Sequence, residues 1–250
     1  MRSITVFSPA LALLAAAAIP AAGSEIDVYP STPALTDTAG SVAGNTAQFA
    51  PGFNSGSWQA TGVKSNFYVT PLALFGHDVL VSDVASMSYW TDQFNYSGSS
   101  NWSLYIYTLN SGAGDSSFWY RSKLFASPGA GLAGWDLWST TSTALGFVDT
   151  DRGGGAASSS LRWSSIAAGT VTLNNGSHWN YSGEKVEFFS LQTDSKARTF
   201  TGLVDGLTVN LTTGESGAVN FEAVPEPGTW TLLTAALGLA AVVGRKRRRI

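Results

Sequence analysis

The sequence predicts an all-β protein whose body is a single β-sandwich. Ten short segments either alternate apolar with polar residues or are rich in the β-branched and aromatic residues that strands favour. They are 66–70, 78–82, 86–90, 103–109, 134–139, 145–148, 170–173, 185–192, 207–211 and 218–222. The gaps hold turn-forming residues, and Asn175-Gly176 predicts a type I′ hairpin turn. Many short strands separated by such turns are typical of a sandwich.

The segment 103–109 favours two packed layers over an open sheet. Leu104 and Ile106 share one face of this predicted strand, and Tyr105 and Tyr107 share the other. A strand with apolar residues on both faces is more often central in its sheet than at an edge.

Composition indicates a folded, exported body. Aromatic residues reach 12%, which excludes a disordered chain, and the absence of Cys excludes disulfides, thiolate metal sites and a cysteine nucleophile. Six of the 14 basic residues lie at the two ends, which leaves eight against 17 acidic residues. The body therefore has a net charge near −9, or −8 without Glu226, and would repel nucleic acid.

The N-terminus predicts a secretory signal peptide over residues 1–23. Arg2 supplies a positive charge, an apolar run follows that is densest over 10–19, and Ala21-Ala22-Gly23 places small residues before a cut at Ser24. The run is too short for a stable membrane anchor. A buried N-terminal helix is the alternative. The body is expected to span residues 24–223.

The C-terminus, residues 224–250, has three parts in order. The first is Val224-Pro225-Glu226-Pro227-Gly228, whose prolines predict an extended hinge. The second is the uncharged stretch 229–244, which is just long enough to cross a bilayer as a transmembrane helix. The third is a basic cluster, which would stay on the cytoplasmic side and leave the body outside. It consists of Arg245, Lys246, Arg247, Arg248 and Arg249.

This arrangement resembles the PEP-CTERM sorting signal of Gram-negative bacteria that make exopolysaccharide. The resemblance implies that an exosortase, a membrane-embedded cysteine protease, recognises the Pro-Glu-Pro segment and processes the tail. It also implies export across the inner membrane, a transient anchor there, and a final place in the cell envelope or extracellular matrix. A single-span anchor that is never cleaved is the alternative.

Two parts of the body also carry a resemblance. The run 66–76, with 86–91 and 102–108 after it, is similar to the body of many exosortase-sorted proteins of unassigned function. Residues 200–209 are similar to the closing strand of concanavalin-like jelly-roll sandwiches, in which an Asp, here Asp205, lies at a turn before the last strands. The resemblance implies a jelly-roll topology and constrains the fold more than the chemistry.

The carboxylates do not predict a catalytic site. Glu184 and Glu187 are three apart, so on a strand they point to opposite faces and cannot flank one glycosidic bond. Glu184 is instead interpreted as part of a solvated turn. Asp149 and Asp151 resemble the start of a calcium loop that lacks its further ligands, and a solvated turn is again the interpretation. Calcium bound by separate loops stays open.

The two histidines do not predict a metal or catalytic site either. His77 and His178 lie about 100 residues apart, and there is no Cys to complete a zinc site and no Gly-x-Ser-x-Gly motif. No catalytic residue, metal or cofactor is predicted.

Aromatic residues beside Asn and Asp supply the candidate glycan contacts. Sugar rings stack their C–H faces on exposed aromatic rings, so two clusters are candidates, although burial in the core is the commoner fate of Trp. The candidates are Trp135 and Trp138 in one cluster and Trp179, Asn180 and Tyr181 in the other. The leading interpretation is a non-enzymatic surface or biofilm-matrix protein in contact with exopolysaccharide. The alternatives are a lectin-like carbohydrate-binding module and a polysaccharide-active hydrolase.

Overall fold

The computed structural model describes most of the body and neither end of the chain. The described residues are 25–30, 42–45, 47–53, 56–61, 65–93, 101–110, 122–128, 134–141, 145–149, 161–173, 176–193 and 200–223. The predicted signal peptide and the segment 224–250 lie outside them, so these two predictions are not tested by the fold.

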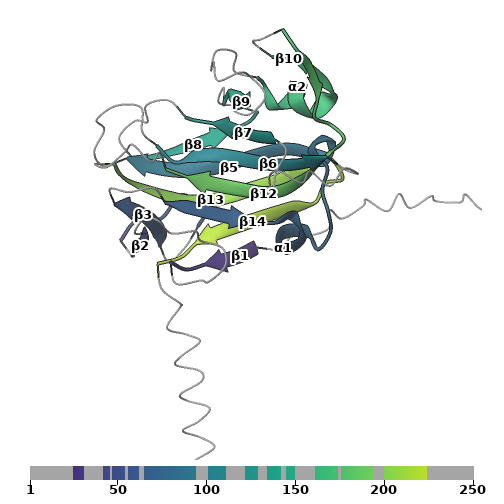
Figure 1. Cartoon of the computed structure of the whole chain (residues 1–250). Coiled ribbons are helices and arrows are strands. Elements are labelled where there is room, and N and C mark those ends of the chain that lie inside the picture. Colours follow the sequence, from purple (N-terminus) through teal and green to yellow (C-terminus); the bar gives the residue numbers. More distant parts are fainter. Residues whose placement is uncertain are drawn as a thin grey trace, which may run out of the picture.

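The described residues form two larger sheets, a small hairpin and three short helical segments (Figure 1). The seven-stranded sheet contains β1 (Glu25–Val28), β2 (Val42–Asn45), β3 (Ser57–Thr61), β5 (Val84–Gln93), β8 (Trp135–Ser139), β13 (Thr201–Leu211) and β14 (Ser216–Phe221). The five-stranded sheet runs in the order β4 (Asn66–Val69), β12 (Glu184–Gln192), β6 (Ser103–Asn110), β7 (Ser122–Ala126) and β9 (Phe147–Asp149). The all-β prediction is confirmed, whereas the jelly-roll topology stays a prediction.

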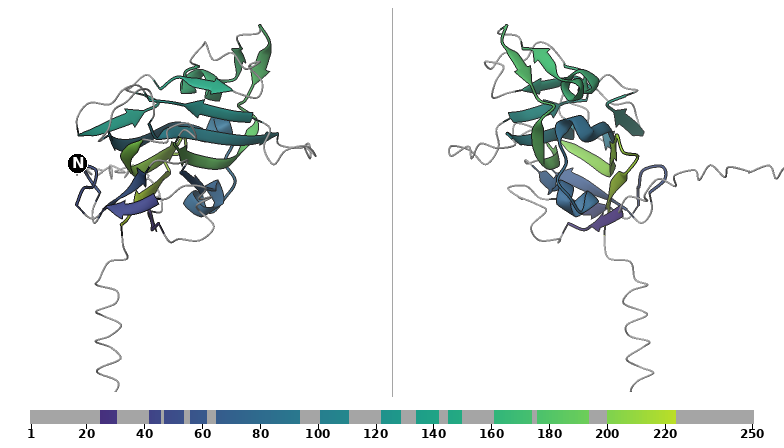
Figure 2. Two further views of the ribbon diagram at one scale, coloured as in Figure 1. Left: turned by 60° about the vertical axis from the view of Figure 1, so that its left-hand side comes forward. Right: turned by 90° about the vertical axis from the view of Figure 1, so that its right-hand side faces the viewer.

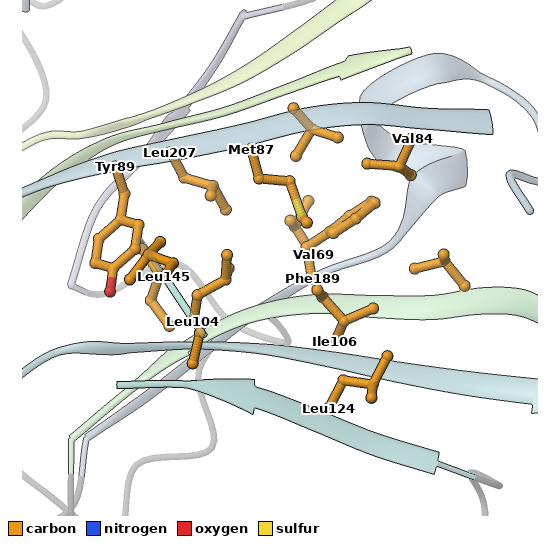
Figure 3. Packing of buried hydrophobic residues seen from close by; sticks show 14 of the residues in the cluster. Val69, Val84, Met87, Tyr89, Leu104, Ile106, Leu124, Leu145, Phe189 and Leu207 are labelled. Carbon is orange, nitrogen blue, oxygen red and sulfur yellow. The ribbon is translucent and has the colours of Figure 1, made fainter. Parts of the chain in front are cut away.

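The two sheets pack face to face around one hydrophobic core (Figure 3). Figure 3 shows Met87 and Tyr89 of β5 pointing toward Leu104 and Ile106 of β6. Burying each such side chain stabilises the fold by roughly 1.5–3 kcal/mol relative to leaving it in water. Strand 103–109 is central in its sheet as predicted, because β6 pairs with both β12 and β7.

Three fully buried tryptophans of the core donate hydrogen bonds to backbone carbonyl groups. The indole Nε1 of Trp102 donates to the Gly202 carbonyl at 3.1 Å, and that of Trp163 donates to the Val84 carbonyl at 2.8 Å. Trp58 donates in the same way near the end of β14. A buried indole N–H without a partner would be costly, so each ring fixes a strand as well as filling space.

The remaining elements lie at the edges of the sandwich. The hairpin β10 (Thr170–Thr172) and β11 (His178–Asn180) lies beside α2 (Trp163–Ala168) at one end, as both views in Figure 2 show. Helix α1 (Pro71–Phe75) begins where Thr70 Oγ1 accepts the Ala73 N–H, and it ends at Gly76, whose φ is 76°. These caps define a single short helix between β4 and the next segment.

The predicted strand 78–82 is wrong. The chain there enters the 3₁₀-helix η1 (Val81–Asp83), and Leu80 makes an isolated bridge to Lys185. The Asp83 carboxylate accepts the Leu80 N–H at 2.9 Å, which replaces a bond that a strand ladder would have made. Val79 and Val81 are both fully buried, and their spacing produced the apparent alternation.

The predicted type I′ turn at Asn175-Gly176 lies partly outside the described residues, because Asn175 is not among them. Of the residues on either side, Leu173 donates to the Ser177 carbonyl at 2.8 Å and accepts from Gly176 at 2.9 Å, and Gly176 takes φ 79°. This register pairs Val171 with Trp179, two apolar side chains. A two-residue turn would shift the pairing by one and place Val171 opposite a polar residue.

Candidate functional site

The last residues of the fold are tied to its first strand. Strands β1 and β14 pair in parallel, with Val28 opposite Phe221. The Glu222 N–H donates to the Val28 carbonyl at 2.9 Å. The Trp58 indole donates to the Val28 carbonyl at 3.1 Å and to the Glu222 carbonyl at 3.2 Å. A single buried side chain therefore joins the beginning and the end of the described chain.

Two glycines allow neighbouring strands to pass close to this end. A Cβ on Gly44 would lie 2.3 Å from the Ala223 carbonyl oxygen, and a Cβ on Gly56 would lie 2.7 Å from the Ala223 Cβ. Gly56 also has a φ of 145°, which favours glycine. The fold thus holds the chain up to Ala223, immediately before the predicted sorting segment.

The predicted membrane and sorting residues lie beyond this point. Val224 to Gly228, the stretch 229–244 and the cluster Arg245 to Arg249 are outside the described residues. Within the residues that the structure does describe, no helix combines the length and apolar character needed to cross a membrane.

The first predicted glycan cluster is divided between the two faces of β8. Trp138 lies opposite the core residue Tyr89, packs against the core, and donates its Nε1 to Thr91 Oγ1 at 2.8 Å. Trp135 is three residues earlier and points to the other face, where it is half-buried beside the exposed Leu137. The two rings therefore cannot stack on one sugar together.

The second predicted cluster is used mainly by the fold itself. Tyr181 is fully buried and donates its hydroxyl to Asp149 Oδ2 at 2.8 Å. Trp179 is half-buried against the core and donates to Glu184 Oε1 at 2.9 Å. Asn180 is exposed, and its Oδ1 accepts the Ser182 N–H at 3.0 Å. A glycan contact through Trp135 or Asn180 stays a prediction.

Two carboxylates that were interpreted as solvated are buried. Glu184 is the first residue of β12, is 3% exposed, and accepts hydrogen bonds from the Thr108 hydroxyl and the Trp179 indole. Asp149 is the last residue of β9 and is also 3% exposed. The solvated-turn interpretation was wrong for both. Each residue lies at the end of a strand rather than in a loop, and its side chain is on the buried face of that strand.

Asp205 differs from the expectation in the same way. It lies within β13 rather than at a turn, and it is fully buried. Its carboxylate accepts N–H groups of Ala50 at 3.0 Å, Gly206 at 2.8 Å and Phe221 at 3.2 Å. Burial raises the pKa of Asp205 to about 7, although the three N–H donors act to lower it. This side chain joins the loop before β3 to the last two strands.

The described residues offer no metal centre. None of their His, Asp and Glu side chains form a group of three or more that could hold an ion. His77 contacts the Asp78 carbonyl at 2.8 Å and Glu215 at 3.3 Å, and these two contacts raise its pKa. His178 lies 3.1 Å from the Thr172 hydroxyl.

A set of aromatic rings on the outer face of the five-stranded sheet was not predicted. We call it the aromatic row. Neighbouring ring centroids lie between 5.4 and 6.3 Å apart, and two of the contacts are stacked, Tyr105 on Phe125 and Tyr105 on Tyr107. The row consists of Tyr68, Tyr105, Tyr107, Phe125 and Phe188.

Polar groups lie among these rings. Gln192 Nε2 donates to the Tyr107 hydroxyl at 2.7 Å and to Ser190 Oγ at 2.9 Å, and it lies 3.4 Å from the Tyr68 hydroxyl. Burial raises the pKa of Tyr107, so this hydroxyl stays protonated near neutral pH. The rings thus surround a set of buried, mutually hydrogen-bonded polar groups, and Tyr68 carries its hydroxyl on a partly exposed residue.

Comparison with known proteins identifies the end of the chain. Residues 223–249 match the family model described as the PEP-CTERM protein-sorting motif, which confirms the resemblance of the tail. No curated protein matches the chain. The matched segment begins at Ala223, the residue at which the described fold ends. The chain is therefore a β-rich protein that ends in a PEP-CTERM protein-sorting motif.

Proposed function

We propose that this chain is a non-enzymatic protein of the cell envelope or extracellular matrix, exported and then processed by an exosortase. The observation that carries the proposal is the sorting motif at residues 223–249, which joins a closed β-rich fold with no intervening linker. The motif supports export and sorting. The non-enzymatic role rests on the body.

The sorting step depends on Pro225, Glu226 and Pro227. The two prolines keep this segment extended, and a protease needs an extended strand because a helix engages the scissile amide in its own hydrogen bonds. Glu226 offers a carboxylate for a basic pocket. The stretch 229–244 and the basic cluster then hold the segment at the outer face of the inner membrane.

A non-enzymatic body is favoured by the way the fold uses its buried carboxylates. Glu184 and Asp149 accept hydrogen bonds from Trp179 and Tyr181, and Asp205 accepts three backbone N–H groups. A glycosidase instead needs two carboxyl groups that face one substrate across a few ångströms. The polysaccharide-active hydrolase is therefore the less favoured proposal.

The sorting proposal is tested by substitutions in the motif. Glu226→Ala and Pro227→Ala are each expected to leave the protein exported and unprocessed in an exosortase-bearing host. Thr231→Ala, in the apolar stretch, is the matched control and should be processed like the wild type. The measurements are the intact mass of the protein and its share in the membrane fraction. Identical processing of all four proteins would reduce the tail to a plain anchor.

The basic cluster is tested in the same host. Changing Arg245, Lys246, Arg247, Arg248 and Arg249 to Gln removes the charges that keep this end cytoplasmic. We expect the variant to leave the membrane fraction without the mass change that marks processing. A variant that stays anchored and is cut normally would contradict the assigned role of these five residues.

A further inference from the structure

We infer that the aromatic row is a binding face for a neutral polysaccharide. The inference rests on the proposed function, since it supplies the contact between a matrix protein and exopolysaccharide. It starts from the position of the rings. Leu104, Ile106 and Leu124 point into the core (Figure 3), so the alternate residues Tyr105, Tyr107 and Phe125 point away from it.

The register of the sheet brings the rings of separate strands side by side. Tyr105 lies directly opposite Phe125 on β7, and Tyr107 lies directly opposite Phe188 on β12. Tyr68 on β4 reaches Tyr107 across β12, with ring centroids 6.0 Å apart. The result is a continuous row of rings across four strands. Tyr68, Tyr105, Phe125 and Phe188 are partly exposed, whereas Tyr107 is 4% exposed.

Stabilisation of the sheet explains part of this arrangement. Cross-strand aromatic pairs contribute roughly 0.2–1 kcal/mol each, and the pair Tyr105 and Phe125 would do so without any ligand. That role does not require hydroxyl and amide groups between the rings. Gln192, Ser190 and Tyr107 are buried and hydrogen-bond one another, and the hydroxyl of the partly exposed Tyr68 lies 3.4 Å from the Gln192 amide.

The chemistry of this face matches a sugar chain. A pyranose presents C–H groups on its faces and hydroxyl groups around its edge, and ligand sites commonly combine aromatic walls with a few fixed polar groups. The row offers successive rings to successive sugar units, and the hydroxyl of the partly exposed Tyr68 offers a polar partner.

Charge favours a neutral polysaccharide over an anionic one. Among Phe188 to Gln192 and the described residues paired with them across the sheet, the one charged residue is Lys123, opposite Tyr107. A single lysine is not the basic cluster that would select an acidic polysaccharide. The body as a whole carries a net charge near −8 without the two ends. An acidic exopolysaccharide would be repelled at a distance, whereas a neutral chain would not.

The test measures binding of the exported, purified protein to dextran, xyloglucan and galactomannan by affinity gel electrophoresis, with anionic alginate as the charged comparison. We expect retardation by at least one neutral polysaccharide and none by alginate. Tyr105→Leu removes the partly exposed ring that stacks on both Tyr107 and Phe125, and it is expected to weaken that binding about tenfold or more. Tyr105→Phe keeps the ring and should stay within about threefold of the wild type.

Two controls keep the result interpretable. Phe49→Leu removes an exposed ring from the loop before β3 of the other sheet and should leave binding unchanged. Thermal unfolding of every variant shows that it is folded at the assay temperature. Absence of binding by the wild type, retardation by alginate alone, or equal loss in Phe49→Leu would overturn the inference. Export and tail processing are measured separately, so the proposed function can survive that result.

Discussion

The indole of Trp58 lies 3.2 Å from the carbonyl oxygen of Glu222, one residue before the matched sorting motif begins. The same Nε1 lies 3.1 Å from the carbonyl oxygen of Val28 at the end of β1. The residues 25–28 and 221–222 are nearly 200 positions apart in sequence, and they meet at this buried ring. This contact therefore joins the two ends of the described fold next to the start of the matched motif.

The first prediction concerns this contact. Trp58→Phe keeps an aromatic ring that can still pack against Phe67 and Phe221, but it removes the N–H donor. The Glu222 carbonyl then loses its indole partner, and the free energy of unfolding should fall by about 1–3 kcal/mol. Urea unfolding followed by tryptophan fluorescence measures the change. Trp135→Phe is the matched control, and an equal loss in both variants would contradict a special role of Trp58.

The second prediction concerns the close approach of β2 to the end of the fold. Gly44→Ala would place a Cβ 2.3 Å from the Ala223 carbonyl oxygen, so one of the two backbones must move. We expect a loss of about 1–3 kcal/mol in the free energy of unfolding, as for overpacking elsewhere. Gly183→Ala meets no atom within 4 Å and serves as the control. The free energy of unfolding of both variants is measured in urea. If the two values agree, the contact at Ala223 does not constrain the fold.

The third prediction separates two glutamates of β12. Glu184→Gln keeps the size of the side chain, but its amide N–H₂ must face either the Thr108 hydroxyl or the Trp179 indole, both of which donate to Glu184. We expect a loss of about 1–3 kcal/mol in chemical denaturation. Glu187→Gln removes a partner 4.0 Å from Lys185 and should change stability by less than about 0.5 kcal/mol. Equal effects would mean that burial of Glu184 is not important for stability.

The strands that the sequence predicts correctly are those whose local pattern of apolar and polar residues is strong. Segments 103–109 and 185–192 alternate strongly, and they became β6 and β12. Strands β1, β2 and β3 were not predicted, because each is four or five residues long and contains polar or small residues. They are defined by pairing with partners far along the chain, such as Val28 with Phe221, and a local pattern does not contain that information.

The candidate site was missed for a related reason. The aromatic row depends on the register between four strands and on a β-bulge between Val186 and Phe188. Continued alternation from Val186 would turn Phe188 inward and Phe189 outward, whereas the bulge reverses both. The opposite faces of Trp135 and Trp138, by contrast, follow from their spacing of three on a strand and were available from the sequence.

The last prediction concerns the dependence of stability on pH. Burial raises the pKa of Asp205 from its ordinary value of 3.8 to about 7, so the folded protein keeps a proton that the unfolded chain releases between these values. The contribution of Asp205 to stability therefore falls as pH rises from about 4 to about 7, and it is constant outside that window. Each pH unit costs about 1.4 kcal/mol, which amounts to about 4 kcal/mol across the window.

Asp205→Asn isolates this contribution, because the amide does not titrate. The free energy of unfolding is measured in urea at about pH 4.5, 6 and 7.5 for the wild type and the variant. We expect the difference, wild type minus Asn variant, to decrease by several kcal/mol between the first and last values. Asp78→Asn changes an exposed carboxylate 3.0 Å from Lys185 and should retain the wild-type slope. Parallel profiles for wild type and Asp205→Asn would show that the three backbone N–H donors outweigh the cost of burial and that Asp205 stays ionised in the fold.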